Sequence, residues 1–277
     1  MALITLNFFS QALNRTVPCN VVIPSDKVVA RGAEAAPRGP YKTLYLLHGI
    51  LGNYTDWVAG TRVQALANAH DLCVVMPSGD NKFYCDSDLS GDYYARFIGQ
   101  ELVEFTRATF NLSTRREDTY IAGLSMGGFG ALVNGLRNMD TFSHIAAFSA
   151  ALIKDRILGA VEEAGHDFFT RAQYCTLFGL QKVADFEGCP WDYDALARAA
   201  GPLQDKPRIY MACGTEDGLF AANTAYRDLL EAQGFTVTWR QERGGHDWNF
   251  WDRAIEWVMD WLPLGEAVRG ISSENVK

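Results

Sequence analysis

The stretch "DTYIAGLSMGGFG" at residues 118–130 decides the fold. Its apolar first part predicts a buried strand, and a helical pattern follows the glycines. Between the two, Ser125 is flanked by Gly123 and Gly127 in a G-x-S-x-G pattern. Strand, sharp turn and helix in this order are typical of a nucleophile elbow, in which the turn presents the serine Oγ. Side chains at the two glycines would collide across such a turn. A glycine-rich loop with an ordinary serine is the alternative that this short pattern leaves open.

Short apolar runs alternate with helical patterns along the rest of the chain. Five of the runs are apolar almost throughout, as is typical of a parallel sheet with helices on both faces. We therefore predict an α/β fold with a mostly parallel, doubly wound central sheet, whose ligands bind at the carboxyl ends of the strands. The predicted strands span 16–24, 42–49, 71–77, 118–123, 144–150, 208–214 and 236–241, and the predicted helices 61–69, 93–109, 127–137, 221–233 and 247–261.

A length of 277 residues is suited to a single α/β domain over residues 1–277. Residues 150–205 interrupt the alternation, because they contain several short helical patterns and no convincing strand. We interpret this segment as a helical insertion, a cap over the edge of the sheet where chemistry is expected.

Composition and charge exclude several classes of protein. The formal net charge of -8 argues against a nucleic-acid partner, since binding phosphates requires a basic surface. Apolar residues make up 48% of the chain but form no run of 18, so a membrane span is not expected. The first residues lack the pattern of a secretory signal, and we expect a cytoplasmic protein.

No metal or cofactor site is predicted. The six cysteines contain no C-x-x-C pair, so they do not form a zinc pattern. Cys175 and Cys189 share the insertion and could form a bridge, but free thiols are the preferred interpretation without a secretory signal. "DSDLSGD" at residues 86–92 begins like a calcium loop, yet Phe97 occupies the twelfth position, where a glutamate is required. We interpret it as a solvated loop.

A serine nucleophile needs a base, and the base needs an acid. His246, in "RGGHDWNFW", follows the last predicted strand, where the base belongs when the order along the chain is serine, acid, histidine. Asp217, in "ACGTEDGLF", lies just beyond the strand at 208–214 and is the predicted acid. The adjacent Glu216 is the alternative.

An oxyanion needs preorganised donors. We expect the backbone N–H of Met126, directly after the serine, and that of Ile50, in the loop after the strand at 42–49. His48 in the same loop is expected to shape it through hydrogen bonds.

Aromatic residues in predicted loops or in the insertion are candidates for the wall of a substrate pocket. Large aromatic residues also dominate protein cores, and core packing is the competing interpretation. For Trp57 the two interpretations are equally weighted. The predicted substrate-binding residues are Trp57, Tyr93, Trp191 and Trp248.

Four motifs together resemble the esterase D superfamily of α/β-hydrolases, which includes tributyrin, feruloyl and acetylxylan esterases and S-formylglutathione hydrolases. They are "LLHGILGNYTDW", "GLSMGGFGAL", "GTEDGLF" and "GGHDWNFW". The opening "ITLNFFSQALNRTVPCNVVIP" is similar to the tributyrin esterase branch, whose chains begin with a strand pair. The resemblance implies an α/β-hydrolase fold with Ser125 as nucleophile, Asp217 as acid, His246 as base, and the amides of Ile50 and Met126 as oxyanion donors.

Two departures bear on the substrate. S-formylglutathione hydrolases carry cysteines after the oxyanion glycine and a histidine in the nucleophile motif, whereas here "GILGNYTDW" has no cysteine and Phe129 replaces the histidine. We therefore predict a serine carboxylesterase that hydrolyses short-chain acyl or acylated-carbohydrate esters through an acyl-enzyme. A feruloyl or cinnamoyl esterase and an S-formylglutathione hydrolase are alternatives, ahead of an acyltransferase or a non-catalytic binding module. The expected partner is a small-molecule ester, with no nucleic acid and no membrane, and a homo-oligomer is left open.

Overall fold

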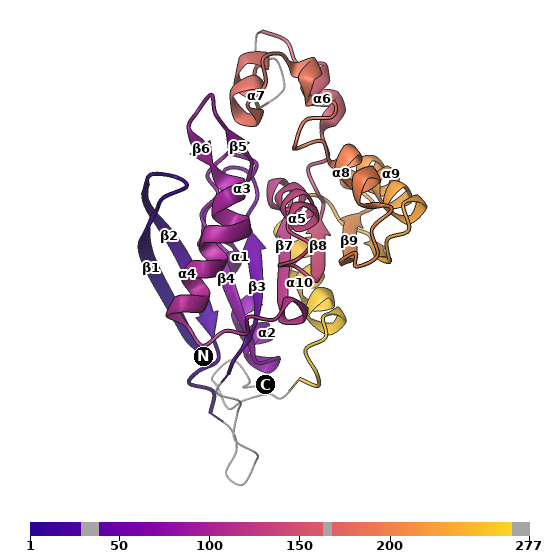
Figure 1. Cartoon of the computed structure of the whole chain (residues 1–277). Helices are drawn as coiled ribbons and strands as arrows, with labels where there is room; N and C mark the ends of the chain where they lie inside the picture. The colour runs from indigo at the N-terminus through magenta and orange to yellow at the C-terminus, as the bar shows by residue number, and fades with distance from the viewer. Residues whose placement is uncertain (29–38, 163–167, 268–277) are drawn as a thin grey trace.

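An eight-stranded sheet forms the centre of the computed structural model, which describes residues 1–28, 39–162 and 168–267 (Figure 1). Its strands are β1 (Ala2–Ser10), β2 (Arg15–Ile23), β3 (Lys42–Leu47), β4 (Leu72–Pro77), β7 (Thr119–Leu124), β8 (His144–Phe148), β9 (Arg208–Gly214) and β10 (Val237–Glu242). The order across the sheet is β1-β2-β4-β3-β7-β8-β9-β10. β2 pairs antiparallel with β1 and β4, and the other pairs are parallel.

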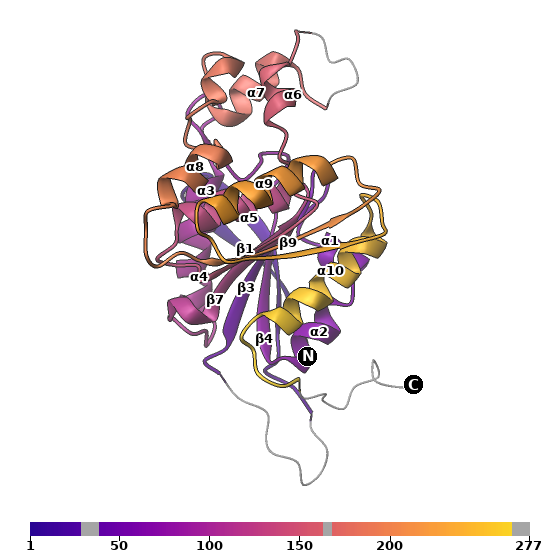
Figure 2. The same ribbon diagram turned by 90° about the vertical axis from the view of Figure 1, so that its right-hand side faces the viewer.

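Helices cover both faces of the sheet (Figure 2). One face carries α1 (Asp56–Gly60), α2 (Val63–Ala69) and α10 (Trp248–Trp261), and the other carries α4 (Leu102–Thr109), α5 (Met126–Arg137), α8 (Tyr193–Ala200) and α9 (Phe220–Ala232). Successive strand residues point to opposite faces. In β3, accordingly, Leu44 and Leu46 join one apolar cluster while Tyr45 and Leu47 join the other. The predicted doubly wound α/β fold is confirmed.

The predicted elements differ from the observed ones in a few places. The predicted helix at 93–109 consists of three successive segments, α3 (Tyr94–Arg96), the π-helix η1 (Phe97–Glu101) and α4. The short helix α1 was not predicted, and a 3-10 turn, η2 (Arg116–Asp118), precedes β7. Within the described part of the chain, no helix combines the length and the apolar character that crossing a bilayer requires.

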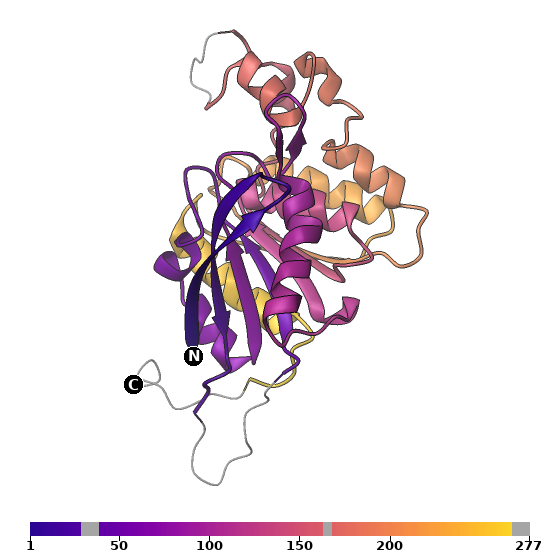
Figure 3. The same ribbon diagram turned by 60° about the vertical axis from the view of Figure 1, so that its left-hand side comes forward.

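The segment between β8 and β9 is helical, and its first part lies beyond the ends of these strands (Figure 1). It contains α6 (Lys154–Leu158), α7 (Arg171–Phe178), a 3-10 turn η3 (Val183–Phe186), and α8. Residues 163–167 of the predicted insertion lie outside the described residues. A small hairpin, β5 (Asp86–Ser87) with β6 (Asp92–Tyr93), rises beside the segment (Figure 3). The hydroxyl of Ser87 donates to the carbonyl oxygen of Thr176 in α7, which ties the hairpin to the insertion.

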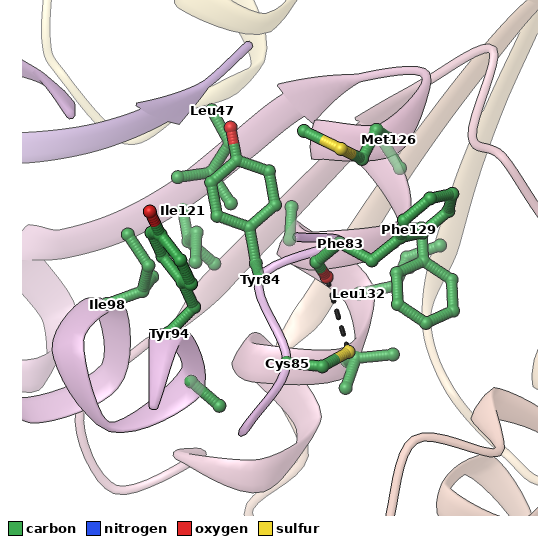
Figure 4. Close-up of a cluster of buried hydrophobic side chains, with 14 of the residues drawn as sticks. Leu47, Phe83, Tyr84, Cys85, Tyr94, Ile98, Ile121, Met126, Phe129 and Leu132 are labelled. Atoms are coloured by element: carbon green, nitrogen blue, oxygen red, sulfur yellow. Dashed lines mark hydrogen bonds between the residues drawn. The ribbon is translucent and has the colours of Figure 1, made fainter. Parts of the chain in front are cut away.

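A cluster of buried side chains, several of them aromatic, packs on and around α5 (Figure 4). Phe83 and Phe129 pack edge to face, with ring centroids 5.6 Å apart. Tyr84 lies against Gly130, where an added Cβ would be 2.5 Å from its ring. The Tyr84 hydroxyl donates to the carbonyl oxygen of His48, 3.0 Å away. This cluster joins α5 to the loop that follows β3.

His144 is a buried histidine at the amino end of β8, of which it is the first residue. Its Nδ1 lies 2.8 Å from the Ser143 hydroxyl, and its ring packs against Tyr120 and Trp261. Burial, helped by nearby arginine and lysine charges, lowers its pKa to about 4 from an ordinary value of 6.5. The folded protein therefore keeps this ring neutral in a pH range where the unfolded chain binds a proton.

We expect His144 to destabilise the protein as the pH falls. Between about pH 6.5 and pH 4, the unfolded state binds more protons at this histidine than the folded state does. The free energy of unfolding therefore decreases as the pH is lowered through that window. In His144→Leu, the loss of unfolding free energy between pH 7 and pH 5 should be smaller than in the wild type. Urea denaturation at the two pH values measures it, and an equal loss in both proteins would contradict the prediction.

Candidate active site

Ser125 sits on a strained turn between β7 and α5. Its backbone has φ 51° and ψ −117°, a conformation that residues other than glycine rarely adopt. A Cβ on Gly123 would lie 2.3 Å from the carbonyl oxygen of Gly127, and a Cβ on Gly127 would lie 2.4 Å from that of Leu47. The predicted collision across the turn is confirmed at Gly123, whereas a side chain at Gly127 would collide with the backbone at the end of β3. The stretch is an elbow that presents the serine side chain at the carboxyl end of the central strand.

Both ring nitrogens of His246 are hydrogen-bonded. Nε2 lies 2.9 Å from Ser125 Oγ, and Nδ1 lies 2.8 Å from Asp217 Oδ2. An ionised carboxylate can only accept, so Nδ1 donates to Asp217, and in the neutral ring Nε2 accepts from the serine hydroxyl. The Asp217 side chain is 1% exposed and that of His246 is 37% exposed. Hydrogen bonds thus connect a buried acid, a partly exposed base and a serine hydroxyl in series.

The carboxylate of Asp217 is stabilised in its ionised form. Burial alone would raise its pKa, but hydrogen bonds from His246, the Leu219 amide and Ser149 outweigh this effect and hold the pKa below its ordinary value. Glu216, the alternative acid, points elsewhere and pairs with Arg243 at 2.8 Å. The structure therefore brings Asp217, and not its neighbour, to the histidine.

His48 shapes the loop after β3, as predicted. Its Nδ1 lies 2.7 Å from the carbonyl oxygen of Gly49, and its Nε2 accepts from the Gly79 amide at 2.8 Å. Burial lowers its pKa, so the ring stays neutral and keeps both contacts. The same loop carries Ile50 to the cavity wall beside Ser125.

Two cavities meet at Ser125, and both are bordered by Ile50 and His246. The first, which we call the apolar cavity, has a volume of about 260 Å³. It is lined by Ile50, Phe83, Ser125, Met126, Ala151, Ile153, Arg156, Phe168, Phe169, Tyr174, Asp217, Gly218, Leu219 and His246. The second, which we call the polar cavity, has a volume of about 370 Å³. It is lined by Gly49, Ile50, Asp56, Leu124, Ser125, His246, Asp247, Trp248 and Trp251.

Of the four aromatic residues predicted to bind substrate, Trp248 lies at the site, in the wall of the polar cavity. The prediction for Trp57 is wrong: the side chain is buried in the core, where its indole N–H donates to the Leu47 carbonyl oxygen at 3.0 Å. Trp191 lines a different cavity, beside the β5–β6 hairpin. Tyr93 donates to Asp88 at 3.0 Å on that hairpin and lines neither described cavity at Ser125.

Much of the apolar cavity was missed from the sequence. Phe83 comes from the loop after β4, Leu219 from the start of α9, and Ile153, Phe169 and Tyr174 from the insertion. The adjacent Phe168 and Phe169 in an otherwise polar stretch were the one signal that could have indicated a pocket wall. All six cysteines, including Cys175 and Cys189, are free thiols.

A doubly wound sheet with a serine elbow and a Ser–His–Asp chain defines a serine hydrolase of the α/β-hydrolase fold. Residues 10–257 match the model of the esterase family, described as "Putative esterase", and the chain belongs to this family. It is 37% identical over 265 residues to an acetyl esterase of Caldicellulosiruptor saccharolyticus, covering 95% of this chain and 98% of that protein.

Solved structures show the same architecture. The substrate-bound fluorophosphonate-binding serine hydrolase F of Staphylococcus aureus is similar with a TM-score of 0.81 and 27% identity, over 94% of this chain and 98% of its own. An S-formylglutathione hydrolase from the same organism matches with a TM-score of 0.79 and 27% identity, over 94% and 98% of the two chains. With these relatives, the chain is a serine carboxylesterase that acts on small-molecule esters.

Proposed function

We propose that Ser125, His246 and Asp217 are the catalytic triad of this esterase. The observation that carries the proposal is the continuous hydrogen-bonded chain from Ser125 Oγ through the His246 ring to the buried Asp217 carboxylate. Ser125 Oγ attacks the ester carbonyl carbon while His246 Nε2 takes the hydroxyl proton. His246 then gives this proton to the leaving alcohol as the C–O bond breaks, which leaves an acyl-enzyme. Water, activated by the same nitrogen, releases the acid.

We assign the oxyanion donors to the backbone amides of Ile50 and Met126. Both residues border the apolar cavity next to Ser125. Met126 is the first residue of α5, so its N–H lies at the positive end of a helix of 12 residues. One N–H is held by the end of a helix, and the other by the loop to which His48 is hydrogen-bonded. The two donors therefore need little rearrangement when the carbonyl oxygen of the substrate becomes negative.

The substrates we propose are short-chain acyl esters and acylated carbohydrates. The apolar cavity suits a small acyl group, and the acetyl esterase relative supports this class. The polar cavity offers Asp56, Asp247 and Trp248, which are side-chain types that bind sugar hydroxyls and sugar faces. An S-formylglutathione hydrolase is the second candidate, on the strength of the Staphylococcus aureus relative. A cytoplasmic location and a homo-oligomer stay predictions.

A kinetic panel tests this function. With p-nitrophenyl esters of increasing acyl length, we expect kcat/KM to be highest for acetate to butyrate and to fall for chains too long for a cavity of about 260 Å³. Acetylated xylo-oligosaccharides, methyl ferulate and S-formylglutathione complete the panel. A kcat/KM for S-formylglutathione above all others would favour the second candidate. Ester products formed in the presence of excess alcohol would indicate acyl transfer instead of hydrolysis.

A further inference from the structure

One cationic side chain stands out in the mostly apolar wall of the apolar cavity at Ser125. Among the residues that line the apolar cavity, Arg156 is the sole lysine or arginine. It belongs to α6, which is anchored by the fully buried side chain of Ile157. Arg156 is an exposed residue of the cavity wall, and its planar guanidinium is suited to pairing with a carboxylate.

Several carboxylates of the insertion and of the cavity wall are bound to partners other than Arg156. Lys154 holds Asp192 and Asp194 at 3.0 and 3.4 Å. Arg171 holds Glu162 at 2.8 Å. The carboxylate of Asp217 in the cavity wall is hydrogen-bonded to His246. Arg156 itself makes no side-chain hydrogen bond and no ion pair with any residue in the described ranges 1–28, 39–162 and 168–267.

The amino-terminal end of α9 is a second positive feature in the wall of the apolar cavity. α9 begins at Phe220, directly after Gly218 and Leu219 in the cavity wall, and it spans 13 residues. Its amino-terminal end therefore adds positive potential at the part of the wall that Gly218 and Leu219 form. The chain as a whole carries a net charge of -8, so Arg156 and the start of α9 are local positive features on an acidic protein.

We propose that Arg156 is a specificity residue that binds an anionic group, a carboxylate in the simplest case, on the half of the ester that occupies the apolar cavity. This inference rests on the proposed function of Ser125 and narrows its substrate class to acidic esters. The guanidinium pairs with two carboxylate oxygens at once, while the apolar wall accommodates the carbon chain that joins the anion to the ester.

Matched pairs of substrates test the proposal. Mono-p-nitrophenyl adipate against p-nitrophenyl hexanoate places the charge on the acyl half. The ester 4-carboxyphenyl butyrate against 4-carbamoylphenyl butyrate places it on the alcohol half. The readout is the ratio of kcat/KM for the anionic ester to that for its neutral partner, because this ratio cancels general damage to the enzyme. The comparison is made for the wild type, Arg156→Gln, Arg156→Lys and Arg156→Glu.

Because the apolar cavity is proposed to hold the acyl group, we expect Arg156→Gln to lower the ratio for the adipate–hexanoate pair by roughly two- to five-fold, as for an ion pair near the surface. Arg156→Lys should retain part of the preference for the anionic ester, and Arg156→Glu should lower the ratio further than Arg156→Gln does. Raising the salt concentration should lower the wild-type ratio. Arg198→Gln is the matched control, because it removes one positive charge from the exposed surface of α8, away from both cavities, and should leave the ratio unchanged.

The outcomes distinguish the role of Arg156 from the role of the triad. Hydrolysis of the neutral esters with a ratio that Arg156→Gln does not change would overturn the role of Arg156 and leave the triad intact. An equal fall in Arg198→Gln would also overturn it, since the effect would then come from overall charge. A wild-type enzyme that hydrolyses none of the esters would overturn the proposed function and this inference together.

Discussion

Ser125→Ala should lower kcat/KM for p-nitrophenyl butyrate by at least about 10⁴-fold while the protein stays folded. The variant removes the one oxygen that His246 Nε2 contacts at 2.9 Å, so no acyl-enzyme can form. The cavities, the amides of Ile50 and Met126 and the Asp217–His246 pair all remain. Steady-state kinetics measures the loss, and circular dichroism checks the fold.

Ser125→Gly is the matched control for this experiment. It removes the same hydroxyl, so it should be equally inactive, although a glycine is free of strain at φ 51°. A fluorophosphonate probe should label the wild type and neither variant. Full activity, or continued labelling, in either variant would show that another residue is the nucleophile.

Gly127→Ala is expected to have the largest effect on folding. An added Cβ would lie 2.4 Å from the Leu47 carbonyl oxygen and 2.6 Å from that of His48, and both of these atoms belong to backbone that cannot rotate away. α5 must therefore shift from β3, which we expect to cost roughly 2–4 kcal/mol of unfolding free energy. Because the same shift moves Ser125 away from Ile50, kcat/KM should fall by about 100-fold or more.

Gly218→Ala provides the stability control for Gly127→Ala. An added Cβ at Gly218 meets no atom within 4 Å, so the unfolding free energy should change by no more than about 0.5 kcal/mol. Urea denaturation of the two variants beside the wild type gives the comparison. Equal stability of Gly127→Ala and the wild type would mean that the contact between helix and loop is not tight.

The central part of the fold and the proposed triad were predictable because local rules govern them. The G-x-S-x-G turn needs small residues on both sides of Ser125, and that requirement is written in five consecutive residues. Asp217 and His246 follow two strands of a parallel sheet, whose carboxyl ends meet at one edge. The choice between Asp217 and Glu216 rested on the same reasoning, and the hydrogen bond of 2.8 Å to His246 agrees with it.

The substrate pocket was less predictable, because it depends on contacts between distant segments. Phe83 and Phe169 are more than 80 positions apart in the chain, yet their rings lie 6.1 Å apart. Trp57 was expected in an open loop, but a short helix folds it back onto the sheet, where the indole N–H finds a backbone acceptor. Neither arrangement follows from hydrophobic periodicity, which describes an element and not its neighbours.

The insertion begins at a segment that is firmly attached to the elbow. The amide of Ala151 donates to the Ser125 carbonyl oxygen at 2.9 Å, and Asn223 of α9 bonds both the amide and the carbonyl of Ala150. Between this anchor and β9, the chain supplies Ile153, Arg156 and Phe169 to the cavity and none of the proposed triad. Part of the cavity wall is thus encoded in a stretch of the gene that contains none of the proposed reacting residues. Exchange of the stretch between Ala151 and β9 among relatives is therefore a way to change the cavity wall without replacing Ser125, Asp217 or His246.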